Sequence, residues 1–146
     1  MLGNCLQMNY LPKFSDLINI ASYFCTKYNF EVEYKSEGIQ GMGCALIVLK
    51  HDTYPKIKIE MDRYFINFQL VLKEDTSLVS IYKFFHPKEL LRNSKSYRKK
   101  KNFHKYYIED QNKYFKDYLQ NQGTFDYKQF IDFYEKYPFN VWKWIE

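Results

Sequence analysis

Histidine is the residue type of this sequence with the most obvious chemical potential, and its spacing limits what that chemistry could be. His51, His86 and His104 are the only histidines of the chain. None lies four residues from another histidine or beside a cysteine pair, as zinc ligands do, so we expect no metal site. A metal-free ribonuclease needs a general base, a general acid and a cation, which His86, His104 and Lys101 could supply. Nothing in their spacing supports that reaction, and ordinary surface histidines are the simpler interpretation.

The glycine-rich stretch 38–43 could cradle a phosphate, because glycine lets backbone amides approach an anion. It precedes an apolar run typical of a strand instead of a helix, however, and no Gly-Lys-Ser/Thr follows. The chain also lacks a Gly-x-Ser-x-Gly motif and a catalytic cysteine signature, and its acidic residues are scattered. We therefore expect a flexible hairpin loop here, no enzymatic activity and no cofactor.

Cysteine usage and hydropathy suggest a cellular compartment. The three cysteines, Cys5, Cys25 and Cys44, are odd in number and show no C-x-x-C spacing, which argues against a disulfide framework. The first residues lack the basic and apolar regions of a secretion signal, and no apolar window approaches about eighteen residues. We expect a cytoplasmic protein with no membrane as a partner.

One segment gives the protein its positive charge. The chain has 22 basic and 17 acidic residues, a formal charge of +5. Residues 88–105 contain eight bases and one acid, a charge of +7, so the rest of the chain, with 14 bases and 16 acids, carries −2. On a helix, the four consecutive bases from Arg98 to Lys101 would span all sides of a turn, so some must project into solvent. An acidic protein, a nucleic acid or only water could face this segment.

The elements that must position this segment are clearest in the middle of the chain. There, apolar and polar residues alternate with the period of two that is typical of strands buried on one face. This alternation predicts a four-stranded antiparallel meander of about residues 30–72. Its last hairpin would turn at Asp62 and Arg63, which places Ile59 opposite Ile66 and pairs apolar with apolar side chains.

Helices are predicted on both sides of the meander from apolar residues at spacings of three and four. One is expected before it, from about Ser15 to Tyr28, with Ser15 as its N-cap. After the meander, residues 77–85 fit a helix capped by Thr76, although their β-branched and aromatic content leaves a fifth strand open.

The C-terminal half is predicted to complete a helical cap. A short helical turn is expected at 88–93, followed by longer helices over about 96–121 and 126–137. No repeat or linker divides the chain, so residues 1–146 form one predicted domain. The predicted fold class is α+β, with an N-terminal helix, a four-stranded meander and a C-terminal cap of about three helices.

In this layout the chain resembles the bacterial immunity proteins of contact-dependent growth inhibition and related polymorphic toxin systems. The resemblance covers the plan of the whole chain, including the meander with Lys56 to Leu72 and a tail that contains Trp142 and Trp144, without a specific motif. It implies a protein that binds one cognate toxin and blocks its active site or its assembly, with no chemistry of its own. Since acidic immunity proteins mask basic nucleases, the basic charge here implies a toxin with an acidic surface.

Two surfaces are candidates for the partner because their residues have no expected role in the core. If the C-terminal helices all pack on the apolar side of the sheet, the polar face of the last hairpin stays open. If they wrap both sides, the basic segment is the better candidate. A nucleic-acid-binding regulator that uses residues 92–105 is the alternative function, although only Tyr97 and Phe103 could stack with bases there. The predicted partner-binding residues are Arg92, Lys95, Tyr97, Arg98, Lys99, Lys100, Lys101, Lys105, Lys56, Lys58, Asn67 and Gln69.

Overall fold

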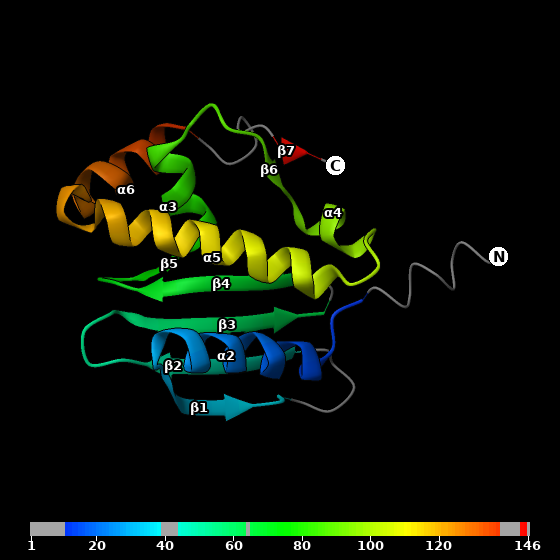
Figure 1. The fold of residues 1–146 in the computed structure, drawn as a ribbon. Coiled ribbons are helices and arrows are strands. Elements are labelled where there is room, and N and C mark those ends of the chain that lie inside the picture. The colour runs from blue at the N-terminus through cyan, green and yellow to red at the C-terminus, as the bar shows by residue number, and fades with distance from the viewer. Residues whose placement is uncertain (1–10, 39–43, 64, 138–143, 146) are drawn as a thin grey trace.

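The computed structural model, which describes residues 11–38, 44–63, 65–137 and 144–145, has the predicted α+β fold (Figure 1). An antiparallel sheet with strands in chain order β1-β2-β3-β4-β5 forms its centre. The strands are β1 (Glu31–Ser36), β2 (Cys44–Lys50), β3 (Lys56–Asp62), β4 (Phe65–Val71) and β5 (Asp75–Ser77). The α-helices are α2 (Phe14–Tyr28) before the sheet and α3 (Leu78–Phe85), α4 (Ser94–Arg98), α5 (Phe103–Asn121) and α6 (Tyr127–Lys136) after it. No helix in the described ranges is both long and apolar enough to cross a membrane.

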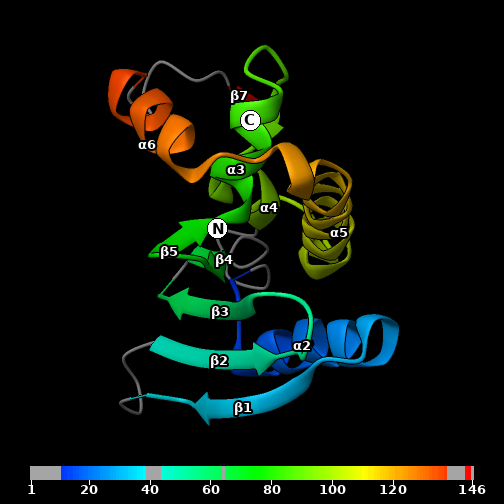
Figure 2. The same ribbon diagram turned by 90° about the vertical axis from the view of Figure 1, so that its left-hand side faces the viewer.

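Helices α2 and α5 pack on the same face of the sheet (Figure 2). The core between them consists of aliphatic residues from alternate strand positions, such as Ile47, Ile59 and Leu70, and of rings from the helices. Phe115 of α5 packs edge-on against Phe24 of α2, with ring centroids 5.9 Å apart. The opposite face of β1–β4 is not covered by any described helix (Figure 2), so the polar face of the last hairpin stays open.

The predicted register of the last hairpin is wrong by two residues. Ile59 pairs with Phe68 instead of Ile66, and Asp62 pairs with Phe65 and so still belongs to β3. The chain therefore reverses one residue later than predicted, and Arg63 has the left-handed φ of 58° that a tight reversal requires. Because side chains alternate with a period of two, this shift leaves every residue on its predicted face.

The two edges of the sheet differ from the predicted four-stranded meander. At one edge, β1 carries a bulge between Val32 and Tyr34, and both side chains are about half exposed. At the other edge, the short strand β5 is added and pairs only with residues 69–71 of β4. Residues 65–68 of β4 therefore have no strand partner on that side within the described part of the chain.

The helices that follow the sheet begin at other residues than predicted. Of the helix and the strand that were possible for residues 77–85, the structure has the helix over residues 78–85, with Ser77 instead of Thr76 as the N-cap. The helix predicted over about 96–121 is confirmed from Phe103 to Asn121 as α5. Its predicted start is wrong, because the chain breaks between α4 and α5, where Asn102 has a left-handed φ of 67°.

The helical turn predicted at 88–93 is also wrong, because one short strand occupies part of this segment. Leu91–Arg92 is a strand, β6, that pairs in parallel with β7 (Trp144–Ile145). A partner more than fifty residues away leaves no trace in local periodicity.

Candidate functional site

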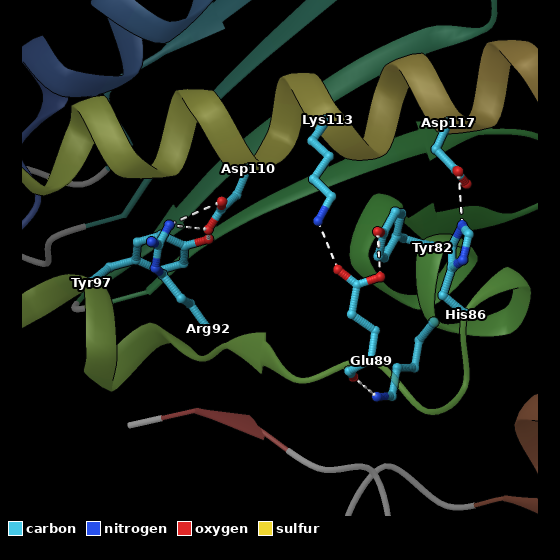
Figure 3. A network of polar contacts seen from close by, with 9 residues as sticks. Tyr82, His86, Glu89, Arg92, Tyr97, Asp110, Lys113 and Asp117 are labelled. Carbon is cyan, nitrogen blue, oxygen red and sulfur yellow. Dashed lines mark hydrogen bonds and ion pairs between the residues drawn. The ribbon is translucent and has the colours of Figure 1, made fainter.

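Helix α5 carries two rows of side chains with different roles. One row faces the core and consists of Phe103, Tyr107, Gln111, Tyr114, Phe115 and Tyr118. The other row consists of Asp110, Lys113 and Asp117, whose spacings of three and four place them on one side of the helix. These three residues contact the segment between α3 and α4 (Figure 3). We call this set of contacts the polar seam. Its partners from α3, from that segment and from α4 are Tyr82, His86, Glu89, Arg92 and Tyr97.

Asp110 holds the first part of the polar seam. Nη1 of Arg92 donates to both carboxylate oxygens of Asp110 at 3.0 Å, and the hydroxyl of Tyr97 donates to Oδ2 at 2.5 Å. Burial, more than the neighbouring Tyr114 and Asp110, raises the pKa of Tyr97 far above its ordinary value, so this hydroxyl stays protonated and donates. Burial alone would lower the pKa of Arg92, but the charge and hydrogen bonds of Asp110 outweigh burial and raise it.

Glu89 forms the middle of the polar seam. Its carboxylate accepts hydrogen bonds from the hydroxyl of Tyr82 at 2.6 Å and from Nζ of Lys113 at 2.7 Å. Its backbone carbonyl accepts a hydrogen bond from Nζ of the fully buried Lys83. Burial alone would raise the pKa of Glu89, but the hydrogen bonds from Lys113 and Tyr82 lower it overall. The segment after α3 is thus fastened to α5 by charged as well as neutral groups.

The histidines do not meet in one place. Nε2 of His86 lies 2.8 Å from Oδ1 of Asp117, at the far end of the polar seam. His104 lies at the start of α5, thirteen residues before Asp117, a separation of about 20 Å along the helix. Nδ1 of His51 accepts hydrogen bonds from the backbone N–H groups of Thr53 and Tyr54 and thereby closes a loop. The structure therefore does not bring His86 and His104 together as the acid and base of one reaction.

Arg92 and Tyr97 have structural roles that the sequence did not reveal. Tyr97 is only 8% exposed and belongs to the core, so the expectation that it has no core role is wrong. The physical reason is Asp110, which offers a partly buried carboxylate to both side chains. The signal available in the sequence was the spacing of Asp110, Lys113 and Asp117 on one helical face, but nothing in it identified their partners.

The remaining bases gather around the break between α4 and α5. Two of them lie over aromatic rings: the guanidinium of Arg98 is 5.6 Å from the centre of Phe65, and Nζ of Lys100 is 4.9 Å from that of Tyr106. Four others are exposed lysines, and we call this group the basic end: Lys95, Lys99, Lys101 and Lys105. Of these, Lys95, Lys101 and Lys105 form no ion pair with any residue that the structure describes.

The polar face of the sheet is open, but its charges are compensated. Lys56 pairs with Glu33 of β1 at 2.9 Å, and Lys58 pairs with Asp75 of β5. On β4, Asn67 is exposed and Gln69 is partly buried. These two lysines therefore each have an acidic neighbour on the sheet, whereas Lys95, Lys101 and Lys105 of the basic end have no ion-pair partner among the described residues.

The glycine-rich stretch is described only in part. Gly38 has a φ of 75°, and a Cβ there would lie 2.5 Å from the carbonyl oxygen of Cys44, so glycine is required for the backbone to approach β2. Gly41 and Gly43 lie outside the described residues. Within the described ranges, no three histidine, cysteine, aspartate or glutamate residues cluster as metal ligands would.

The two charged regions are what the structure offers as a candidate site. In the polar seam, charges from the segment after α3 are paired with those of α5. At the basic end, exposed lysines surround a helix break, and three of them, Lys95, Lys101 and Lys105, form no ion pair with a described residue. Comparison of the chain with protein-family models, with curated proteins and with solved structures gave no match. The function must be inferred from the chain's own geometry.

Proposed function

We propose that this protein is a binding module that captures an acidic protein surface through its basic end, as an immunity protein captures a cognate toxin. One observation supports the proposal above the others: Lys95, Lys101 and Lys105 are exposed without a described ion-pair partner. The nearby Arg92 and Lys113 both have carboxylate partners. Unpaired charge at one end of a molecule is what a charged partner can use.

The local electrostatics bear on why lysines occur at these positions. Residues 94–105 contain six bases and no acid. The N-terminus of α5 adds a partial positive charge to the same place, so Lys101 and Lys105 are unfavourable for the helix by roughly 0.3–1 kcal/mol each. Folding stability does not account for lysine at these positions. Attraction of an acidic surface does, because such a field accelerates association by roughly 10- to 1,000-fold.

The polar seam supports the same function by making the surface rigid. Arg92 and Tyr97 fasten the chain on either side of Lys95 to Asp110 of α5. A surface that is ordered before binding loses less conformational entropy when a partner arrives. The basic end is therefore presented on a fixed support, as tight neutralisation of a toxin requires.

The alternative function, binding of nucleic acid, has less support. Its two candidate stacking residues, Tyr97 and Phe103, are only 8% and 7% exposed and belong to the core. Binding of single-stranded nucleic acid usually combines a basic groove with exposed aromatic rings. Lysines alone would give weak contacts to phosphate that disappear as the salt concentration rises.

The test is a growth experiment in which the polypeptide encoded by the neighbouring reading frame serves as the candidate toxin. Cells that express this polypeptide should stop growing, and co-expression of the wild-type chain should restore growth. A variant in which Lys95, Lys99, Lys101 and Lys105 are all changed to Gln should fail to restore growth. Its complex should form at least about tenfold more slowly, because the attraction that steers association is lost.

A matched variant controls for net charge. Lys35, Lys50, Lys116 and Lys128 are also exposed, and their replacement by Gln removes the same number of charges from other parts of the surface. This variant should rescue growth as well as the wild type does. Equal rescue by both fourfold variants would contradict the proposed role of the basic end. Retention of the wild type on duplex DNA at physiological salt, without binding of the polypeptide, would favour the alternative.

A further inference from the structure

A cavity of about 550 Å³ lies where β4 has no strand partner. Residues 65–68 of β4 form one wall, β6 and α4 form another, and α5 closes the bottom. Its volume falls within the range of roughly 300–1,000 Å³ that is usual for small-molecule sites. The short strand β5 leaves the edge of β4 open at this point, which is why the core does not fill the space.

The floor of the cavity contains two buried polar groups that have no hydrogen-bond partner among the described residues. Tyr107 and Gln111, which lie one turn apart on α5, are 3% and 5% exposed. The hydroxyl of Tyr107 and Oε1 of Gln111 have no hydrogen-bond partner within the described structure. Buried polar groups are nearly always paired because an unpaired one destabilises the folded protein. Gln111 also occupies a position of the core-facing row where the helical period calls for an apolar side chain.

Aromatic rings surround these two groups. Tyr97, Tyr114 and Phe68 line the cavity and are almost completely buried. Burial raises the pKa of Tyr107 well above its ordinary value, so its hydroxyl is neutral and can donate a hydrogen bond. The interior therefore suits a flat ring with polar atoms on its edge.

The rim of the cavity is basic. Arg92, Lys95 and Arg98 line it, and no acidic residue does so within the described structure. Part of the charge of Arg92 is compensated by Asp110, but Lys95 is exposed and has no described ion-pair partner. The potential at the entrance is therefore positive, and it favours a ligand that carries a negative group.

We propose that this cavity binds a small organic anion, with its flat hydrogen-bonding ring against Tyr107 and Gln111 and its anionic group at Lys95 and Arg98. This binding site shares Lys95 with the basic end, but the proposal does not depend on the capture of a protein. Two sources supply such chemistry: nucleoside monophosphates, with a base and a phosphate, and hydroxybenzoates, with a phenol ring and a carboxylate.

Calorimetric titration of the purified full-length chain distinguishes these sources. The probes are the four ribonucleoside monophosphates and 4-hydroxybenzoate, with inorganic phosphate as the control that lacks a ring. Saturable binding of a nucleotide or of 4-hydroxybenzoate, stronger than that of phosphate, is the expected result and identifies the source. No binding of any ring-bearing probe at millimolar concentration, or equal binding of phosphate, would overturn the proposal.

Substitution of Gln111 by Leu tests the position of the ligand. This change removes an unpaired buried polar group at nearly constant volume, so the melting temperature should rise by about 2–4 °C. The affinity for the ring-bearing probe should fall by roughly tenfold, as expected for one lost hydrogen bond. A gain in stability together with a loss of binding is a sign that a residue is kept for a ligand and not for folding.

Two further variants keep this test decisive. Tyr107→Phe removes only the unpaired hydroxyl and should also weaken binding without lowering the melting temperature. Lys116→Gln removes an exposed charge on the same helix that does not line the cavity, and it should leave the affinity within about twofold of that of the wild type. Unchanged affinity in both Gln111→Leu and Tyr107→Phe would overturn the proposal, as would an equal loss of affinity in Lys116→Gln.

Discussion

The polar seam and the basic end are built from one stretch of sequence, but the fold uses their charges in opposite ways. In the polar seam, Arg92 and Glu89 meet oppositely charged residues of α5 at 2.7–3.0 Å. At the basic end, only a few residues later, Lys101 and Lys105 meet no described carboxylate. A cluster of charge in a sequence is therefore not one functional unit, because tertiary structure decides which charges are structural and which are available.

The break at Asn102 separates the two regions. Beyond it, α5 runs back along the segment after α3, so that its acidic residues reach Arg92 and His86. The first turn of α5 contains no acidic residue that could neutralise Lys101 or Lys105. The comparison predicts that changes in the polar seam alter stability, whereas changes at the basic end alter binding.

The largest effect on stability is expected from Asp110→Asn. This change leaves the guanidinium of Arg92 partly buried without a full negative partner and weakens the hydrogen bond from Tyr97. Because both ionic side chains are largely shielded from solvent, with side-chain exposures of 28% and 17%, the free energy of unfolding should fall by about 2–3 kcal/mol. Urea denaturation measures this loss.

The neighbouring residue gives a matched control. Glu109 is exposed on the same helix, and Glu109→Gln removes the same charge without touching the polar seam. Its free energy of unfolding should stay within about 0.5 kcal/mol of that of the wild type. If Asp110→Asn and Glu109→Gln were equally stable, Asp110 would not stabilise the fold through Arg92 and Tyr97. The expectation that changes in the polar seam alter stability would then be contradicted.

A smaller and pH-dependent effect is expected from Glu89→Gln. The pKa of Glu89 is lowered in the folded protein, so its ionised form stabilises the fold at pH values above the ordinary value of 4.5. At pH 7 the variant should lose about 1 kcal/mol, a modest amount because the carboxylate is partly exposed. The difference from the wild type should disappear as the pH falls through the lowered pKa of Glu89. Denaturation curves at a series of pH values test this, and a difference that persisted in acid would contradict an ionic role.

The smallest effect on stability, with the opposite sign, is expected from Lys105→Glu. It replaces a cation in the first turn of α5 by an anion, which interacts favourably with the helix dipole. The free energy of unfolding should rise by about 0.5–1 kcal/mol, while the affinity for the neutralised polypeptide should fall. Thermal denaturation and a binding titration measure the two quantities. A variant that gained stability and bound as well as the wild type would show that Lys105 is not part of the contact surface.

The strands and helices that depend on the local pattern of apolar and polar residues could be predicted from the sequence. Alternation in the meander predicted the strands and their faces, and helical spacing predicted α2, α3, α6 and the part of α5 from Phe103 onward. The register of the last hairpin was wrong, because period-two alternation is equally well satisfied when a strand is shifted by two residues.

Features that depend on distant partners were not predictable in this way. The parallel pairing of β6 with β7 joins Leu91 to Trp144, and neither strand has a local pattern of its own. The role of Tyr97 depends on Asp110, thirteen residues away across a helix break that the sequence did not signal. The exposed lysines of the basic end were predicted more easily, because a dense run of bases cannot be buried.

The measurement that tests the central claim most directly is the rate at which each lysine is acetylated by a small amine-reactive reagent. Lys95, Lys101 and Lys105 should react rapidly in the free protein, because they are exposed and without described ion-pair partners. Lys83 should react slowly because it is fully buried, and Lys113 should react slowly because its hydrogen bond to Glu89 raises its pKa. In the complex with the neutralised polypeptide, the lysines of the basic end should become protected, while Lys35 and Lys128 should not. Slow labelling of the basic end in the free protein, or unchanged labelling in the complex, would contradict the account.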